Sequence, residues 1–285
     1  MIPVYPDFSE IDLLQRATMH PLFQQLPDGI SEFTFANIYL FRNSHHYRVS
    51  RLSDELLLIA GTDEGKPFFM LPFGLPDETL LQRFFKDFGT MKCVSALQAE
   101  VLTQLGCRVL EDRDNFDYLY LRKDLAELTG GKFHKKRNLI KAFVSNYSYE
   151  GRPLLEEYMP DALSVLDAWR KGRDDPGDYI AAKEALEKAE ELQLCGGVYY
   201  VGGRPVAYSL GEELMMGRSF AIHFEKAIGE YKGLWQFVNQ AFASILPDIY
   251  ETVNREQDLG EEGLRHAKLS YKPCDFVKKF RAVLF

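Results

Sequence analysis

The sequence predicts an α+β protein of two lobes, each with a mixed, mostly antiparallel sheet flanked by helices. Runs of alternating apolar residues, typical of strands, are interspersed in both halves with apolar stripes of helical spacing. A glycine-bearing segment at residues 128–131 separates the halves and favours a boundary there. We therefore expect an N-terminal lobe over residues 1–125 and a C-terminal lobe over 126–285.

The composition indicates a globular protein and argues against several other classes. The chain is 46% hydrophobic and 13% aromatic, which is enough to bury a substantial core. No apolar run approaches the roughly 20 residues that span a bilayer, and the first residues do not resemble a signal peptide, so a cytoplasmic protein is expected. A net charge of -8 disfavours non-specific coating of nucleic acid. The four cysteines are far apart, so we expect reduced thiols and no metal site.

The first lobe is predicted to be rich in strands. A short helix is expected over 9–16, with Ser9 as its cap and Ile11 and Leu14 facing inward, whereas 33–41 is ambiguous between helix and strand. The helix that begins at Pro76 has a clear apolar stripe. The other elements expected are strands at 47–52, 55–61, 67–71, 108–110 and 116–121, and a helix at 95–105.

The second lobe shows a characteristic order of elements. Helices come first, then three antiparallel strands, a glycine-bearing loop, an apolar helix, a strand, a helix and a strand. Gly202 and Gly203 predict a two-residue hairpin between the first two strands. The expected helices are 134–144, 160–169, 178–194, 234–246 and 260–268, and the expected strands are 198–201, 206–210, 218–225, 249–253 and 276–284.

This order resembles the acetyltransferase superfamily, and the resemblance implies that the loop before the apolar helix faces a phosphate or acyl group. Gly229 and Gly233 suit such a loop, because glycine lets the backbone approach a ligand closely. The helix N-terminus that follows favours an anion. Tyr231 stands where the superfamily's loop has a small residue. The alternative is that the glycines only cap the helix and turn the chain.

Three stretches carry a closer resemblance. They are residues 131–138 (GKFHKKRN), 231–235 (YKGLW) and 254–265 (NREQDLGEEGLR) continuing to 268–273 (KLSYKP). They are similar to a bacterial family related to the catalytic domain of phosphatidylglycerol lysyltransferase. The resemblance implies two tandem acetyltransferase-like (GNAT-type) lobes, as in transferases that move an amino acid from tRNA. The distinctive polar runs of the sequence fall in the C-terminal lobe, so we expect the site there.

The most polar run of the second lobe directly follows a predicted strand. It contains Asn254, Arg255, Glu256 and Asp258. Polar residues at the C-terminal end of a strand commonly face a ligand crevice, and an arginine binds carboxylate or phosphate through two hydrogen bonds. We expect Asn254 and Arg255 to bind an anion or the donor, and Glu256 or Asp258 to act as a general base. The alternative for Asp258 is a helix cap.

Further candidates flank this run. Lys268 is a candidate anion ligand and Tyr271 a candidate proton donor to a leaving group, although a surface lysine and a packed tyrosine are common. Lys135, Lys136 and Arg137 form a basic helix that suits tRNA or a phosphate-bearing donor, or is simply a solvated face.

Residues outside these motifs give weaker signals. His223 and Glu225 lie on one face of a strand, where they flank the crevice or form a satisfied polar pair. Trp169 and Trp235 are expected in the core. No pattern supports a serine hydrolase or a metal.

The functional hypothesis is direct transfer of an acyl or aminoacyl group to a primary amine, without a covalent enzyme intermediate. No permanently bound cofactor is expected, and the candidate donors are acyl-CoA and aminoacyl-tRNA. The alternatives are an acetyl-CoA-dependent N-acetyltransferase and a non-catalytic module that binds tRNA or a phosphate ligand. The amine acceptor and the oligomeric state do not follow from the sequence.

Overall fold

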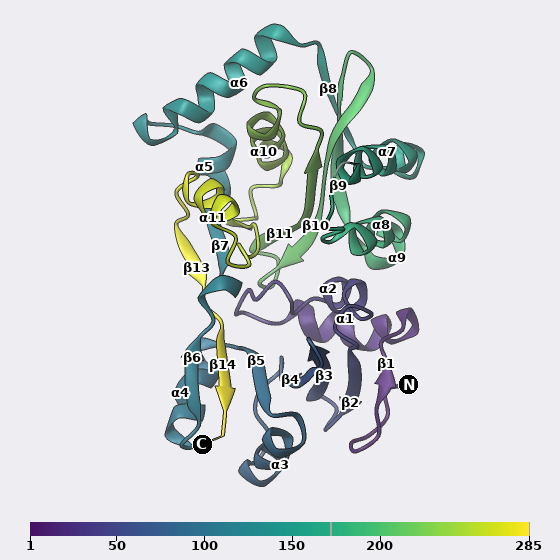
Figure 1. The fold of residues 1–285 in the computed structure, drawn as a ribbon, viewed down its shortest axis with the longest axis vertical. Helices are drawn as coiled ribbons and strands as arrows, with labels where there is room; N and C mark the ends of the chain where they lie inside the picture. The colour runs from purple at the N-terminus through teal and green to yellow at the C-terminus, as the bar shows by residue number, and fades with distance from the viewer. Residues whose placement is uncertain (172, 285) are drawn as a thin grey trace.

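The computed structural model describes residues 1–171 and 173–284, which form two seven-stranded sheets lying one below the other in Figure 1. The strand order of the first sheet is β1 (Ser9–Glu10), β2 (Arg48–Arg51), β3 (Leu57–Asp63), β4 (Lys66–Met70), β5 (Thr90–Val94), β14 (Phe280–Val283) and β6 (Arg108–Glu111). That of the second is β13 (Asp275–Val277), β7 (Asp117–Leu121), β12 (Thr252–Asn254), β11 (Ser219–Ala227), β10 (Arg204–Leu214), β9 (Cys195–Val201) and β8 (Tyr149–Pro153).

Among the strands of the described residues, the β4–β5 and β11–β12 pairs are parallel and the other pairs antiparallel. Both sheets are therefore mixed and mostly antiparallel, which confirms the predicted α+β class. The helices of the first lobe are α1 (Arg16–Gln24), α2 (Phe35–Leu40), α3 (Glu78–Phe88) and α4 (Ala96–Gln104). Those of the second are α5 (Arg122–Glu127), α6 (His134–Asn146), α7 (Met159–Arg170), α8 (Tyr179–Glu187), α9 (Ala189–Leu192), α10 (Leu234–Ile245) and α11 (Glu262–Leu269).

Several elements differ from the sequence prediction. Residues 9–10 form a strand, and the first helical turn is capped by Asp12 because its side chain and that of Gln15 form a capping box. Leu14 is exposed, whereas Ile11 is buried as expected. Strands β5 and β8 were not predicted, and the ambiguous segment 33–41 contains the buried helix α2.

The strands do not follow the division of the chain at residue 125. Strand β7 precedes that position but pairs with β12 and β13 in the second sheet. The segment predicted as one closing strand is two strands, because β13 belongs to the second sheet and β14 enters the first sheet between β5 and β6. An apolar cluster that includes α1, α2, α7 and α8 is also continuous across the two lobes.

A buried polar network joins the lobes where the chain passes from β13 to β14. The ammonium of Lys279 donates to Asp117 Oδ1 at 2.7 Å and also contacts Glu32. Asp117 accepts from the Ser31 amide at 2.9 Å and from Asn254 Nδ2 at 3.2 Å. Lys279 is 1% exposed and Asp117 0% exposed, so this ion pair is shielded from water.

Lys279→Met should therefore destabilise the whole protein by about 3–5 kcal/mol, because it leaves a buried carboxylate without its counter-charge. Its neighbour Lys278 is a matched control, since it pairs with Glu111 at the surface and Lys278→Met should cost less than about 1 kcal/mol. Urea unfolding of both variants measures the difference. Equal stability of the two would contradict the role given to Lys279.

Candidate functional site: the gap between β11 and β12

The second sheet opens where β11 and β12 separate. Their parallel pairing covers only Ser219–Ala221 against Thr252–Asn254. At this point the register with β10 shifts, so that Leu210 faces Phe224 while Gly211 faces Ile222, and β11 carries one extra residue. That bulge at His223 bends the strand and reverses the face of the residues that follow. Phe220 and Ile222 accordingly lie in one apolar cluster and Phe224 in the other.

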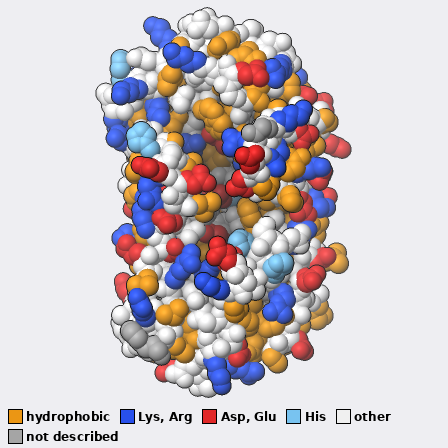
Figure 2. Space-filling view, in the orientation of Figure 1, with side chains coloured by type: hydrophobic (Ala, Val, Ile, Leu, Met, Phe, Trp, Pro, Cys, Tyr) orange, Lys and Arg blue, Asp and Glu red, His pale blue; other side chains and the backbone are white. Residues whose placement is uncertain are grey.

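Two side-chain bridges cross the gap beyond the last backbone pair. His223 Nδ1 lies 2.7 Å from Glu256 Oε1, and Arg255 NH2 donates to Glu225 Oε1 at 2.9 Å. Their side chains are between 2% and 18% exposed. From the alternation in the sequence, we expected His223 and Glu225 either to flank a crevice or to form a satisfied polar pair. In the structure each reaches across the gap to a partner of its own. Figure 2 shows this face hollowed over β11, between α11 and α8, with acidic side chains around the hollow.

His223 is held between two carboxylates. Its Nε2 lies 3.0 Å from Glu212 Oε1, on the side away from Glu256. Burial alone lowers the pKa of His223, but the hydrogen bonds to Glu212 and Glu256 outweigh burial and raise the pKa to about 10. The ring is therefore an imidazolium at neutral pH and donates to both glutamates.

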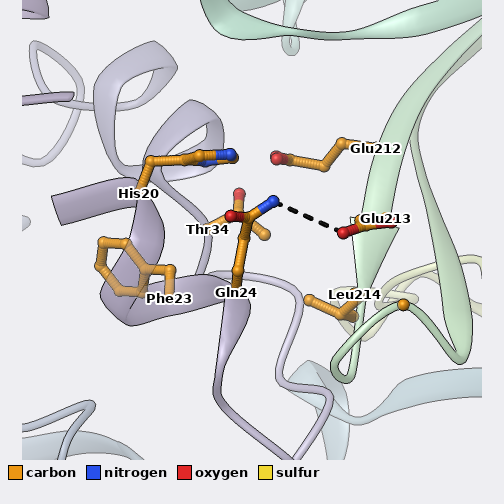
Figure 3. A pocket seen from close by; sticks show the side chains of 8 residues that line it. His20, Phe23, Gln24, Thr34, Glu212, Glu213 and Leu214 are labelled. Atoms are coloured by element: carbon orange, nitrogen blue, oxygen red, sulfur yellow. Dashed lines mark hydrogen bonds between the residues drawn. The ribbon is translucent and has the colours of Figure 1, made fainter. Parts of the chain in front are cut away.

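Glu212 also lines a small cavity between the lobes, which has room for about one water molecule. In Figure 3 the ring of His20, from the first lobe, points across this cavity toward Glu212. Gln24 Nε2 donates to Glu213 Oε1 at 3.4 Å beside it. Glu212 could not be recognised from the sequence, because its contact with His223 depends on the β10–β11 register.

Aromatic rings and a second cation surround Arg255. Its guanidinium lies 5.3 Å from the ring centre of Tyr271 and 6.0 Å from that of Tyr120. Lys136 Nζ lies 3.9 Å from the ring centre of Tyr271 and donates to Ser270 Oγ at 2.7 Å. Burial raises the pKa of Tyr271 to about 12, so this phenol stays protonated at neutral pH. Of the predicted basic helix, Lys136 thus reaches the gap.

The other two residues of the basic helix do not contact the gap. Arg137 donates to the carbonyl of Leu128 and, at 2.6 Å, to that of Gly130, so it closes the end of α5. Lys135 is exposed to solvent. The predicted anion-binding helix is therefore divided between one residue at the gap, one structural residue and one surface residue.

Lys268 acts on the backbone of the segment after β12. Its ammonium donates to the carbonyls of Arg255 at 2.6 Å and Glu256 at 3.1 Å, and to that of Gln257. Burial, together with the positive charge of Arg255, lowers the pKa of Lys268 to about 8. These contacts hold a turn in which Glu256 has a positive φ of 55°. In this arrangement Lys268 shapes the site, in place of the anion contact that we predicted.

Asp258 has a structural role in place of the catalytic role that we predicted. It is fully buried and accepts from Tyr118 Oη at 2.5 Å, from Arg265 NH2 at 2.7 Å and from the Gly260 amide at 2.9 Å. Burial alone raises its pKa, but the hydrogen bonds from Arg265 and Tyr118 outweigh burial and hold the pKa well below its usual range. A carboxylate with so many donors is a poor base.

Asn254 is also buried and structural. Its Nδ2 donates to the Gly29 carbonyl at 3.0 Å and to Asp117, and its Oδ1 accepts from the Glu256 amide at 2.7 Å. The side chain thus connects the first lobe to the turn that carries Glu256, and the donor contact predicted for it is replaced by these bonds.

In the loop that contains Gly229 and Gly233, Gly233 has a structural role. It fits the alternative stated above, in which the glycines cap the helix and turn the chain. Gly233 has φ +89°, and a Cβ there would lie 2.2 Å from the Leu139 carbonyl of α6. Glycine is therefore required for α6 to pack against the start of α10. Tyr231 packs edge-on against Tyr147, with 5.1 Å between ring centres. A Cβ at Gly229 would meet no atom within 4 Å, so Gly229 remains open to a ligand.

Comparison of the chain with known proteins identifies its family. The model described as "Phosphatidylglycerol lysyltransferase, C-terminal" matches residues 23–283. The chain belongs to this family. The sequence resemblance is thereby confirmed, and at a coarse level the family supports an acyl- or aminoacyl-transferase.

The solved structures support the same fold. A conserved protein of unknown function from Bacteroides thetaiotaomicron is 31% identical, with a TM-score of 0.89 and 100% of both chains covered. L-PGS from Bacillus licheniformis is 13% identical, with a TM-score of 0.65, covering 99% of this chain and 93% of its own. A tandem GNAT protein from the clavulanic acid biosynthesis pathway is 10% identical, with a TM-score of 0.53 over 97% and 98% of the two chains. The tandem acetyltransferase-like fold is thus confirmed.

An uncharacterized protein of Mycoplasmoides gallisepticum is 25% identical over an alignment of 177 residues, which covers 58% of this chain. The chain spans 54% of the length of this curated relative. Among residues 1–171 and 173–284, no helix is long and apolar enough to cross a membrane.

The His223 site predicts a specific pH dependence of stability. Because the folded pKa of His223 is raised to about 10 from an ordinary value of about 6.5, its contribution is complete below pH 6.5 and is lost as the pH rises toward 10. Relative to His223→Asn, the free energy of unfolding of the wild type should therefore fall over this range. Urea titrations at pH 6, 8 and 10 measure it.

His46→Asn is the control, because the side chain of His46 is exposed. Asparagine tolerates the positive φ of this residue, so the substitution adds no backbone strain. The difference between this control and the wild type should not change with pH. A stability difference for His223→Asn that grows with pH would contradict an imidazolium between the two glutamates.

Proposed function

We propose that this chain transfers an aminoacyl group from an ester donor directly to a primary amine, in the gap between β11 and β12. The family description supports transfer of an aminoacyl group, since it names a lysyltransferase. The observation that carries the proposal is a set of three buried oxygens beside the two bridges: Glu225 Oε2, Ser209 Oγ and Tyr199 Oη. They have no hydrogen-bond partner within the part of the chain that the structure describes.

The strand register brings these oxygens together. Ser209 directly faces Glu225 on one side and Gly197 on the other, so all three positions share one face of the sheet. Directly opposed residues have Cβ atoms about 4.5–5.5 Å apart. The Tyr199 hydroxyl lies back over Gly197, 3.2 Å from where a Cβ would be. The three oxygens therefore line a single patch next to Arg255.

The chemistry of the patch favours an ammonium group. Buried polar atoms without partners cost free energy, and a carboxylate oxygen costs more than a hydroxyl. An ammonium has three N–H donors, one for each of the three oxygens. Its positive charge also suits the carboxylate of Glu225, which supplies one of these oxygens. The ammonium of an aminoacyl group fits this patch, whereas an acetyl group has no donor for it.

The neighbouring residues have the properties that direct attack requires. The carboxylate of Glu256, held by the imidazolium of His223, accepts the proton of the attacking amine while the new C–N bond forms. The C–O bond of the donor ester then breaks, and the protonated Tyr271 gives a proton to the leaving alkoxide. Arg255 and Lys136, which both lie beside the ring of Tyr271, supply the positive charge that favours the negative charge developing on the carbonyl oxygen.

Removing the base should strongly slow transfer with little effect on binding. Glu256→Gln is expected to lower kcat by about 10²–10⁴, the usual contribution of a general base. The assay uses bulk aminoacyl-tRNA that carries a radiolabelled amino acid, together with a primary amine. The rate at which the labelled amide forms measures transfer. Glu251, an exposed residue directly before the start of β12 at Thr252, gives the control: Glu251→Gln should leave kcat unchanged.

Glu225→Gln separates the proposal from its rivals. A stable analogue, 3′-aminoacylamido-adenosine, should raise the Tm of the wild type because it binds only the folded chain, and this rise should be lost in Glu225→Gln. A rise with coenzyme A and none with the analogue would favour an acetyl-CoA-dependent N-acetyltransferase. A rise with aminoacyl-tRNA but no amide product from the wild type would favour a non-catalytic module.

A further inference from the structure

Glu212 is a buried acid that has no part in the proposed transfer steps. It lies on β10 directly opposite Ala221, the last residue of β11 that pairs with β12. Its side chain is 6% exposed. A carboxylate taken out of water costs free energy unless a cation or several hydrogen-bond donors compensate it. The contacts of Glu212 therefore indicate what the residue is for.

Glu212 binds the far end of the ring that holds the base. Its Oε1 lies 3.0 Å from His223 Nε2, while His223 Nδ1 lies 2.7 Å from Glu256 Oε1. The side chain of His223 is 2% exposed, so the ring is shielded from solvent. Both ring nitrogens are engaged, and the two carboxylates together fix the rotation of the ring. The position of Nδ1, which meets Glu256, thus depends on the contact at Nε2.

The charge of the ring depends on Glu212 as well. Burial lowers the pKa of His223, and the hydrogen bonds to Glu212 and Glu256 more than reverse that effect. A neutral imidazole donates through only one of its nitrogens, so it would leave one of the two carboxylates facing a lone pair. Glu212 therefore favours the doubly protonated ring, which is the form that donates to Glu256.

The other side of Glu212 faces the first lobe. The ring of His20 points toward it across the cavity between the lobes (Figure 3). Burial and the charge of Arg16 lower the pKa of His20, so this ring is neutral at neutral pH. Glu213, the next residue of β10, accepts from Gln24. Among the described residues, the ion pair of Glu212 is with His223, so its negative charge acts on that ring.

The remaining titratable groups near the ring and Glu212 leave the charge of His223 to the two acids. They come from β9, β11, the turn after β12 and α11, and they are Cys195, Glu225, Arg255 and Lys268. Arg255 is paired with Glu225, and Lys268 donates to backbone carbonyls. Burial raises the pKa of the Cys195 thiol, so the thiol is uncharged at neutral pH.

We propose that Glu212 is a positioning residue of the transfer reaction. It holds the His223 ring from the side of the first lobe, keeps that ring a cation, and so fixes the carboxylate of Glu256 where the attacking amine arrives. The effect passes through the ring, because Glu212 binds it on the side away from Glu256. This inference rests on the proposed function, in which Glu256 is the general base.

The inference also gives the first lobe a part in the chemistry. Helix α1 supplies three residues to the wall of the cavity beside Glu212: His20, Phe23 and Gln24. These side chains shield the carboxylate from bulk water, and a shielded carboxylate acts more strongly on a neighbouring cation than an exposed one. The lobe without the gap thereby strengthens the contact that holds the base.

NMR of the histidine rings tests the charge of His223 directly. The chain has six histidines, and comparison with His223→Asn assigns the ¹⁵N signals of this ring. In the wild type the ring should titrate near pH 10. Glu212→Gln keeps the shape of the side chain and removes its charge, so the midpoint should fall by about 1–3 pH units, the usual effect of one neighbouring opposite charge. An unchanged midpoint would overturn the inference.

Glu213→Gln is the matched control. It removes the same charge from the next residue of β10, beside the same cavity, and should leave the midpoint of His223 unchanged. A fall as large as that in Glu212→Gln would report net charge alone and would overturn the inference. If Glu212→Gln does not fold, Glu212→Asp gives the comparison, because it keeps the charge on a shorter side chain. Its midpoint should lie below that of the wild type, and an equal midpoint would contradict the role of the contact.

The rate of transfer gives a second readout. Glu212→Gln should lower kcat by about 10- to 100-fold and leave the KM for aminoacyl-tRNA unchanged, since displacing a reacting group by about 1 Å can cost about 10²-fold. Glu213→Gln should change neither parameter. A raised KM with an unchanged kcat in Glu212→Gln would overturn the positioning role, because it would place Glu212 in substrate binding.

The two readouts keep this inference separate from the proposed function. If the wild type forms no amide product, the proposed function fails, and the NMR titration still decides whether Glu212 sets the charge of His223. If the wild type is active and Glu256→Gln lowers kcat, but Glu212→Gln changes neither kcat nor the midpoint, the positioning role fails while the transferase stands.

Discussion

The buried ammonium of Lys279 is the contact on which the relation between the two sheets depends. It lies at the point where the chain leaves the second sheet and enters the first, and it neutralises Asp117 at the start of β7. Asp117 in turn binds Ser31 and Asn254, so one carboxylate fixes a loop of the first lobe and the end of β12. The turn that carries Arg255 and Glu256 begins at that point. The geometry of the gap is therefore set by a charge pair that does not belong to it.

Within the gap, side-chain hydrogen bonds connect β11 to the turn after β12, beyond the point where their backbone pairing ends. The bulge at His223 separates β11 from β12, and the pairs His223–Glu256 and Glu225–Arg255 then bridge the space that opens. Each pair uses a residue of β11 and a residue of the turn after β12. Lys268 donates to three carbonyls of that turn, and these hydrogen bonds replace the backbone pairing that β12 no longer provides there. The result is a polar, partly closed site with one patch of acceptor oxygens left over.

The sequence was informative wherever local chemistry decides the structure. The helical stripe of α3, the hairpin at Gly202 and Gly203, and the order of elements in the second lobe all follow from short-range patterns, and so does the position of the polar run after β12. The pairing of strands that are distant in the sequence could not be predicted from such patterns. Nothing near residue 117 or residue 279 indicates that these segments change sheets, because that depends on an ion pair between residues 162 positions apart.

The same limit explains the candidate site. Arg255, Glu256 and Lys136 could be named as candidates from the sequence because their residue types and spacing are unusual. Asp258 has the same residue type as a base, yet the side chains that donate hydrogen bonds to it come from distant positions or from the following helix: Arg113, Tyr118 and Arg265. Glu212 was not predicted, because its contact with His223 depends on strand register. Trp169 was expected in the core, and it packs against the first apolar cluster but is only partly buried.

The insertion of β14 between β5 and β6 has a consequence for synthesis on the ribosome. Until the last residues of this sequence emerge, β5 and β6 lack the strand that separates and pairs them, and each keeps a free row of backbone donors and acceptors. The first lobe, although made first, thus finishes folding after the second has been produced. Nascent chains of this protein should depend on protection of those two open edges in the interval.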